Sequence, residues 1–150
     1  MENPKDYGFN SQLIHYSGHH DAYGSATVPI YQTSTFSFES AQDGADCFAG
    51  VKPGYMYTRI GNPTVKALER QVALLEHACD SVAVASGMAA VSTVYLALLN
   101  AGDHVVSSSA VYGASRVLME QHMSRFGVES TYVNTADIEA VKAAMRPNTK

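Results

Sequence analysis

The chain has 150 residues, of which 46% are hydrophobic, and a formal net charge of -4. This length and apolar content suit one modest domain with a buried core and argue against a disordered chain. The net negative charge argues against nucleic acid or an anionic membrane as a partner, because both require a basic protein surface.

The first fifty residues show little sustained periodicity and are rich in Gly, Ser, Thr, Tyr and His. Pro29 and the run at 33–38 indicate extended, partly β-like segments joined by turns. Such a segment cannot bury much of its own surface, so it needs another surface to pack on. We therefore predict that residues 1–60 form an N-terminal arm.

A regular helix is predicted to begin after residue 61. Asn62 is a favourable N-cap, and Pro63 suits the first helical position, where its missing N–H costs nothing. The helix should extend to about His77. Apolar side chains recur at spacings of three and four and predict one buried face. These side chains are Val65, Leu68, Val72 and Leu75.

Short apolar runs alternate with helical segments through the rest of the chain. Gly127 is expected as the C′ residue of one helix, and Pro147 ends the last helix. The alternation indicates an α/β fold with a mostly parallel sheet. Three strands make a thin sheet with exposed edges, so residues 61–150 are interpreted as the first part of a larger, incomplete domain. The predicted elements are a strand at 81–85, a buried helix at 88–99, a strand at 104–108, a helix at 114–126, a strand at 128–133, and a helix that Asp137 or Thr135 caps and that continues through Met145.

No metal site, secretion signal or membrane span is predicted. Cys47 and Cys79 form neither a CxxC pair nor a Cys/His set with zinc-ligand spacing, so a reducing compartment is the simpler interpretation. The first twenty residues contain no apolar segment of signal-peptide length. The apolar stretch at 91–99 is too short to span a bilayer. We expect a cytoplasmic protein with no membrane partner.

The turn between the predicted strand at 81–85 and the next helix is the first candidate site. Ser86 and Gly87 form this turn, and Gly87 lets a ligand approach the backbone closely. The unpaired N–H groups that open a helix, together with its dipole, favour a phosphate group. A plain tight turn explains the same residues equally well. A nicotinamide-binding domain would fit the strand–helix alternation, but the glycine fingerprint of that class is missing.

Tyr57 and Arg59 form the second candidate site. Arg59 supplies a planar charged fork that suits phosphate, and Tyr57 supplies a hydroxyl. In an extended segment, residues two apart face the same side. A solvated arginine beside a surface tyrosine is the alternative.

Tyr112 follows the predicted strand at 104–108 and is the third candidate. At the end of a strand it could stack on an aromatic ligand and also offer a phenol for proton transfer. A tyrosine of the core or of a turn is the alternative interpretation.

Taken in order, these segments resemble the Cys/Met-metabolism family of pyridoxal 5'-phosphate (PLP) enzymes. The resemblance implies the type I, aminotransferase-like PLP fold and a homotetramer built from dimers that share active sites. The matching segments are VPIYQTSTF (28–36), YTRIGNPT (57–64), LE (75–76), ASGMAA (85–90), GDHVV (102–106), VYG (111–113), FGVE (126–129) and AAMRPNTK (143–150).

The resemblance assigns cofactor-binding roles to these sites. In that family, Tyr57 and Arg59 match the pair that reaches the cofactor phosphate of the neighbouring subunit. Gly87 and Met88 match backbone donors to the phosphate within the same subunit, and Ser86 is assigned to the same phosphate turn. Tyr112 matches the tyrosine that stacks on the pyridine ring and takes part in proton transfer.

The implied substrate is a small sulfur amino acid. The implied reaction is γ-elimination of L-methionine, which gives methanethiol, ammonia and 2-oxobutanoate. The alternative is γ-replacement of the kind that O-acetylhomoserine sulfhydrylase or cystathionine γ-synthase performs. Methionine γ-lyases often carry cysteine two residues after the stacking tyrosine, whereas Ala114 stands there, so this position does not identify the substrate.

The family's cofactor lysine and the aspartate that pairs with the pyridine nitrogen match positions beyond Lys150. No lysine of this chain has the family's Ser-x-Thr-Lys context, so none is assigned that role. A non-catalytic fragment is therefore the alternative for the 150 residues taken literally. The lysines are Lys5, Lys52, Lys66, Lys142 and Lys150.

Overall fold

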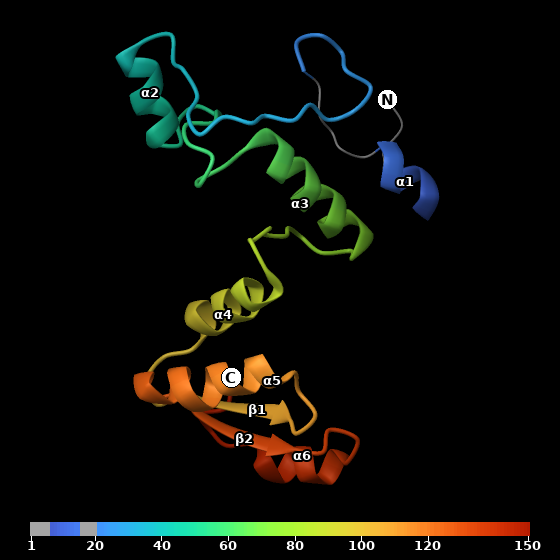
Figure 1. The fold of residues 1–150 in the computed structure, drawn as a ribbon, viewed down its shortest axis with the longest axis vertical. Coiled ribbons are helices and arrows are strands. Elements are labelled where there is room, and N and C mark those ends of the chain that lie inside the picture. Colours follow the sequence, from blue (N-terminus) through green and yellow to red (C-terminus); the bar gives the residue numbers. More distant parts are fainter. Residues whose placement is uncertain (1–6, 16–20) are drawn as a thin grey trace. The chain divides into compact units, whose positions relative to one another are not determined.

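The structure is a computed structural model that describes residues 7–15 and 21–150. The chain divides into two compact units, Met1–Ala83 and Val84–Lys150. Figure 1 shows the first unit in blue to green and the second in yellow to red. The functional division into an arm at 1–60 and a cofactor domain at 61–150 stays a prediction.

In its described residues the first unit contains three helices, two of which the sequence pattern did not predict. Ser40 caps one of these two, because its hydroxyl accepts the N–H of Asp43 at 3.1 Å. Gln71 donates a side-chain hydrogen bond to the Gln12 carbonyl, which ties the first helix to the third. The first helix therefore contacts the third. The helices are α1 (Phe9–His15), α2 (Ala41–Phe48) and α3 (Pro63–Leu75).

Helix α3 begins as predicted. The Asn62 side chain accepts the Thr64 N–H at 2.9 Å, and Pro63 occupies the first helical position. The predicted buried face is wrong, however, since Leu68 is 57% exposed. The residues that α3 buries lie on another face, because no described segment covers the predicted one. They are Pro63, Ala67, Ala73 and Leu74.

The extended run at 33–38 pairs with the segment that precedes α3. Thr35 forms an isolated antiparallel bridge with Tyr57. Phe36 donates its N–H to the Met56 carbonyl at 3.1 Å, and Thr58 donates its N–H to the Ser34 carbonyl at 2.9 Å. The predicted β-like character of this run is confirmed.

The second unit is an α/β arrangement around two parallel strands. Its strands pair from His104↔Glu129 to Ser108↔Val133, and helical segments connect them. In Figure 1 the segment that begins with α5 lies on one side of the strands and α6 on the other. The elements are α4 (Gly87–Leu98), β1 (His104–Ser108), α5 (Gly113–Val117), the π-helix η2 (Leu118–His122), the 3-10 helix η3 (Met123–Phe126), β2 (Glu129–Val133) and α6 (Ile138–Ala144).

The core of this unit lies between the strands and the η2–η3 segment. Met119, Met123 and Val128 are at most 3% exposed. Beside the start of β1, Thr149 makes an isolated parallel bridge with His104. The buried ring of His104 bonds the hydroxyls of Thr149 and Thr131, each at 2.8 Å. Both ring nitrogens therefore have partners, as a buried polar group requires.

The predicted strand at 81–85 is wrong. These residues have no strand assignment, and Val82 is 76% exposed. A strand is defined by the neighbour with which it pairs, and in the described residues this run has none. Its apolar composition is therefore not matched by burial.

The helix predicted at 88–99 forms as α4, but its expected burial is wrong. No residue of α4 is buried, and Leu96 is 64% exposed. The run is apolar on all sides, which is typical of a helix that other elements enclose. None of the helices in the described ranges is both long enough and apolar enough to cross a membrane.

The helix predicted at 114–126 is one continuous helical segment of three geometries, α5, η2 and η3. The Ser124 hydroxyl donates to the Glu120 carbonyl four residues earlier, at 2.6 Å. Back-bonding of this kind competes with the regular ladder and bends helices. Gly127 then ends the segment with φ of 80°, which confirms its predicted C′ role.

Replacing Gly127 with alanine is expected to lower the free energy of unfolding by about 1–2 kcal/mol, because L-residues are strained at positive φ. The new Cβ would also lie 3.2 Å from the Cβ of Ala101. Thermal unfolding of the complete polypeptide measures the loss. Gly113→Ala is the matched control, since a Cβ at Gly113 meets nothing within 4 Å. Equal unfolding temperatures for the two variants would contradict the expectation.

Candidate functional site

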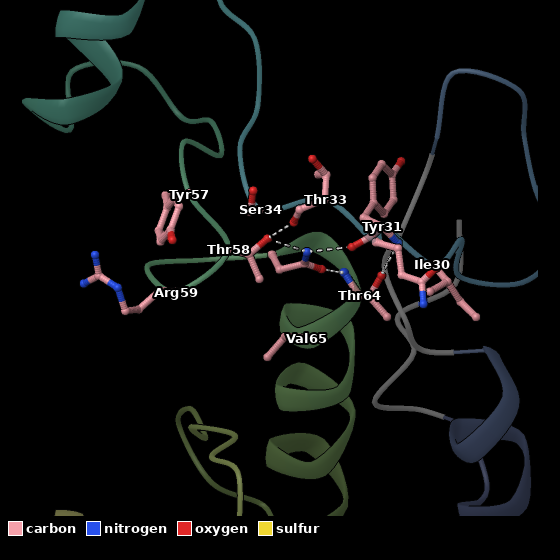
Figure 2. Close-up of a pocket in the computed structure, with 11 residues that line it drawn as sticks. Ile30, Tyr31, Thr33, Ser34, Tyr57, Thr58, Arg59, Thr64 and Val65 are labelled. Carbon is pink, nitrogen blue, oxygen red and sulfur yellow. Dashed lines mark hydrogen bonds between the residues drawn. The ribbon is translucent and has the colours of Figure 1, made fainter.

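The predicted pair Tyr57 and Arg59 lies on one side of a tight turn. Ile60 and Gly61 both donate their N–H groups to the Tyr57 carbonyl, at 2.8 and 3.0 Å. The guanidinium carbon of Arg59 lies 5.1 Å from the centre of the Tyr57 ring. Figure 2 shows Thr58 directed the other way, toward Thr33. The shared side is confirmed, although a turn produces it and not the extended segment that we expected.

A pocket of about 620 Å³ lies beside this turn. Arg59 contributes to it and has no carboxylate partner within the described parts of the chain, whereas Lys52 and Arg116 each form an ion pair. An exposed guanidinium without an internal counter-charge can bind an external anion bidentately. The pocket is lined by Ile30, Tyr31, Gln32, Thr33, Ser34, Tyr57, Thr58, Arg59, Asn62, Thr64 and Val65.

The turn that opens α4 carries the second group of predicted residues. Ser86 is the N-cap, and its hydroxyl accepts the Ala89 N–H at 3.1 Å. The N–H groups of Gly87 and Met88 have no acceptor in the described residues. A Cβ built on Gly87 would meet nothing within 4 Å, so the space beside the Gly87 Cα is open. This arrangement suits an anion.

Tyr112 stands at the N-cap position of α5, directly after the turn that follows β1. Its side chain is 72% exposed, so it is not a core tyrosine. The Ser115 hydroxyl donates to the Met88 sulfur at 3.7 Å, which links the start of α5 to the start of α4. The tyrosine and the turn before α4 therefore belong to neighbouring segments of the second unit.

The six predicted residues thus fall into two groups, one in each unit. The first unit holds Tyr57 and Arg59, and the second holds Ser86, Gly87, Met88 and Tyr112. Their roles toward a cofactor stay predictions. In the described ranges, no group of three or more His, Cys, Asp or Glu side chains could hold a metal ion.

Three of the four lysines within the described residues, Lys52, Lys66 and Lys142, form ion pairs there. The Lys66 ammonium lies 3.1 Å from both carboxylate oxygens of Asp80, and this hydrogen bonding raises the pKa of Lys66. Hydrogen bonding to Asp43 likewise raises the pKa of Lys52. Lys142 pairs with Glu139 at 2.8 Å. An amine must lose its proton before it can attack a carbonyl, so these pairs disfavour a covalent role.

Sequence reasoning identified Asn62 only as a helix cap. The residue is 3% exposed, and its side-chain amide also donates to the Tyr31 carbonyl at 2.9 Å and to the Thr58 hydroxyl at 3.1 Å. No local sequence pattern predicts the hydrogen bond to Tyr31, because Tyr31 lies 31 residues from Asn62 in the sequence. The amide therefore connects the segment around Tyr31 to the turn that carries Tyr57 and Arg59.

Comparison with known proteins places these residues in context. The chain is 45% identical to an L-methionine gamma-lyase of Fusobacterium nucleatum subsp. polymorphum over 146 residues, which are 97% of this chain and 37% of that protein. It is 41% identical to an O-acetyl-L-homoserine sulfhydrylase of Corynebacterium glutamicum, over 99% of this chain and 34% of that protein. The chain thus spans just over a third of the length of these relatives.

A solved structure matches as well. It belongs to a protein of Campylobacter jejuni named as an O-acetylhomoserine (thiol)-lyase, and it contains N'-pyridoxyl-lysine-5'-monophosphate. The TM-score is 0.85 at 29% identity, and the match covers 100% of this chain and 36% of that one. The family model described as "Cys/Met metabolism PLP-dependent enzyme" matches residues 10–150. The fold class expected from the sequence is confirmed, and the chain belongs to the Cys/Met-metabolism family of PLP-dependent enzymes.

Proposed function

We propose that this chain supplies the phosphate-binding part of an enzyme that cleaves L-methionine by γ-elimination, with methanethiol, ammonia and 2-oxobutanoate as products. The observation that supports this reaction best is the 45% identity to a methionine gamma-lyase over 97% of the chain. Because the chain spans 37% of that relative, the proposal concerns the complete polypeptide to which these residues belong.

The open turn before α4 fits the phosphate of PLP. Gly87 and Met88 offer two N–H groups without acceptors in the described residues, and a Cβ at Gly87 would meet nothing within 4 Å. Ser86 accepts from Ala89, which leaves its own hydroxyl hydrogen available to donate. The dipole of the twelve-residue helix α4 adds a favourable field for the dianion.

Tyr57 and Arg59 would supply further donors to a cofactor phosphate. The guanidinium can form two parallel hydrogen bonds, and the phenol of Tyr57 can add a third. Arg59 is exposed and has no carboxylate partner in the described residues. It can therefore serve a phosphate outside the first unit, including one that a second copy of the protein holds.

Tyr112 would act at the reacting end of the cofactor. Bound PLP supplies an electron sink that stabilises negative charge on the substrate carbon. The exposed ring of Tyr112 can cover an aromatic cofactor, and its phenol can donate a proton to the sulfur that leaves as methanethiol. The lysine required to hold the cofactor is assigned to no residue of this chain.

The alternative reaction is γ-replacement, in which a thiol takes the place of the leaving group. The 41% identity to the sulfhydrylase of Corynebacterium glutamicum favours this reading. Ala114, two residues after Tyr112, is not the cysteine that methionine γ-lyases often carry there. The same binding groups serve both reactions, so the substrate has to be identified by experiment.

The assembly and location of the protein belong to the same proposal. We infer a homotetramer of dimers, in which one subunit's Arg59 serves the cofactor of its partner, and a cytoplasmic location. The unpaired charge of Arg59 supports the first inference, and the cysteines, which form no disulfide within the described residues, support the second.

The proposed reaction predicts that the complete polypeptide releases methanethiol and 2-oxobutanoate from L-methionine alone. Product formation is measured by thiol titration and by 2-oxo acid assay, after the intact mass and the visible absorbance before and after borohydride confirm a bound cofactor. Homocysteine formed only from O-acetyl-L-homoserine and sulfide would favour γ-replacement. A mass of 150 residues without a chromophore would favour the non-catalytic fragment.

A further inference from the structure

We infer that Asn62 is a positioning residue: its side-chain amide holds the Tyr57–Arg59 turn against the segment around Tyr31, and so fixes the direction of the Arg59 guanidinium. This inference rests on the proposed role of Tyr57 and Arg59 in phosphate binding. It goes beyond the helix-capping role that the sequence assigns to Asn62.

All three polar positions of the Asn62 amide are in use. Its oxygen accepts the Thr64 N–H at 2.9 Å, which caps α3. Its nitrogen donates one hydrogen to the Tyr31 carbonyl at 2.9 Å and one to the Thr58 hydroxyl at 3.1 Å. Only a side-chain amide combines this acceptor with two donors in so small a volume. At 3% exposure, few waters could replace the lost bonds.

Thr58 connects the Asn62 amide to Tyr57 and Arg59, the proposed phosphate-binding pair. Its hydroxyl accepts from Asn62 and donates to the Thr33 carbonyl, and its backbone N–H donates to the Ser34 carbonyl at 2.9 Å. Thr58 is thus fixed on the side that faces Thr33 and Ser34. Its sequence neighbours Tyr57 and Arg59 consequently lie on the opposite side, as Figure 2 shows.

The segment around Tyr31 is itself held in place by hydrogen bonds to Thr64. The Thr64 hydroxyl donates to the Pro29 carbonyl at 2.8 Å and accepts the Tyr31 N–H at 2.9 Å. The segment around Tyr31, whose carbonyl accepts a hydrogen bond from Asn62, is therefore fixed to the first turn of α3. An arginine that starts from a fixed turn loses less conformational entropy when it binds an anion.

Substitution can separate the helix-capping role of Asn62 from its positioning role. Asn62→Ser keeps a good N-cap but is too short to donate to Tyr31 and Thr58. Ser40→Ala is the matched control, because it removes the side-chain cap of α2, and Ser40 bonds Asp43 and does not touch the Tyr57–Arg59 turn. If Asn62 had only a structural role, the Asn62→Ser and Ser40→Ala variants would retain the cofactor equally well.

The test uses the complete polypeptide purified as the holoenzyme, with the PLP dissociation constant measured by equilibrium dialysis. Asn62→Ser is expected to raise this constant about tenfold, and Ser40→Ala by less than about twofold, even where both lower the unfolding temperature. In an Arg59→Ala background, Asn62→Ser should add no further loss, because the amide acts through Arg59.

Each contrary result has a distinct meaning. Equal dissociation constants for the Asn62→Ser and Ser40→Ala variants would overturn the positioning role. A full additional loss from Asn62→Ser in the Arg59→Ala background would overturn it too, because Asn62 would then act independently of Arg59. An unchanged constant for Arg59→Ala alone would instead overturn the proposed phosphate-binding function, and the inference with it.

Discussion

Replacing Tyr112 with phenylalanine is expected to lower the turnover of L-methionine by about 100-fold or more, while the PLP dissociation constant changes by less than about threefold. Proton transfer by a positioned side chain contributes about 10²–10⁴ in rate, and phenylalanine removes the proton without removing the ring. The stacking surface that would hold the cofactor ring is kept. Turnover and cofactor retention are measured on the same holoenzyme preparation.

The surroundings of Tyr112 explain why turnover should fall while the PLP dissociation constant changes little. The side chain is 72% exposed, and its hydroxyl has no hydrogen-bond partner within the described residues, so its removal leaves no buried group unsatisfied. Tyr95→Phe is the matched control, since this tyrosine packs against the Met119 cluster. A loss of turnover no greater than that of the control, or a parallel loss of PLP, would contradict a role in proton transfer.

The elements predicted correctly are those whose signals are local. Asn62 and Asp137 cap α3 and α6 through bonds to N–H groups two or three residues ahead. Gly127 adopts the positive φ that its place after a helix suggests. Such signals depend on a few neighbouring residues, so the sequence is sufficient to predict them.

The errors concern burial and pairing, which depend on distant segments. The run at 81–85 is apolar enough for a strand, but a strand requires a partner. Helix α4 forms where predicted, yet its Leu96 and Leu98 are exposed. Composition predicts that such surfaces will be covered, but it does not identify the segment that covers them. Helix α2 was missed although Ser40 and Asp43 form a recognisable capping pattern.

The candidate site shows the same division. The segments that carry Arg59, Gly87 and Tyr112 could be identified from residue type and position. The planar guanidinium of arginine, the accessible backbone of glycine and the phenol of tyrosine are properties of single residues. The contribution of Asn62 could not, because Tyr31 and Thr33 approach this region only in the folded arm. Candidate residue types can thus be read from the sequence, whereas the contacts that hold them in place cannot.

Replacing Arg59 with alanine is expected to raise the PLP dissociation constant of the holoenzyme by about 10- to 100-fold. Hydrogen bonds to a charged group contribute about 1.5–3 kcal/mol, which corresponds to this range. Arg59→Lys should show a smaller loss, because lysine keeps the charge but not the bidentate fork. Equilibrium dialysis measures both variants.

Arg70→Ala is the matched control for the loss of charge, since Arg70 is an exposed arginine of α3 in the same unit as Arg59. A general effect of net charge on a phosphate ligand would lower PLP affinity equally in both alanine variants, and higher salt would weaken it in both. A specific contact predicts instead that only Arg59→Ala is impaired and that the difference persists at high salt. Equal constants for the two variants would therefore mean that Arg59 contributes charge alone, and that the fork it presents beside Tyr57 is not part of the phosphate site.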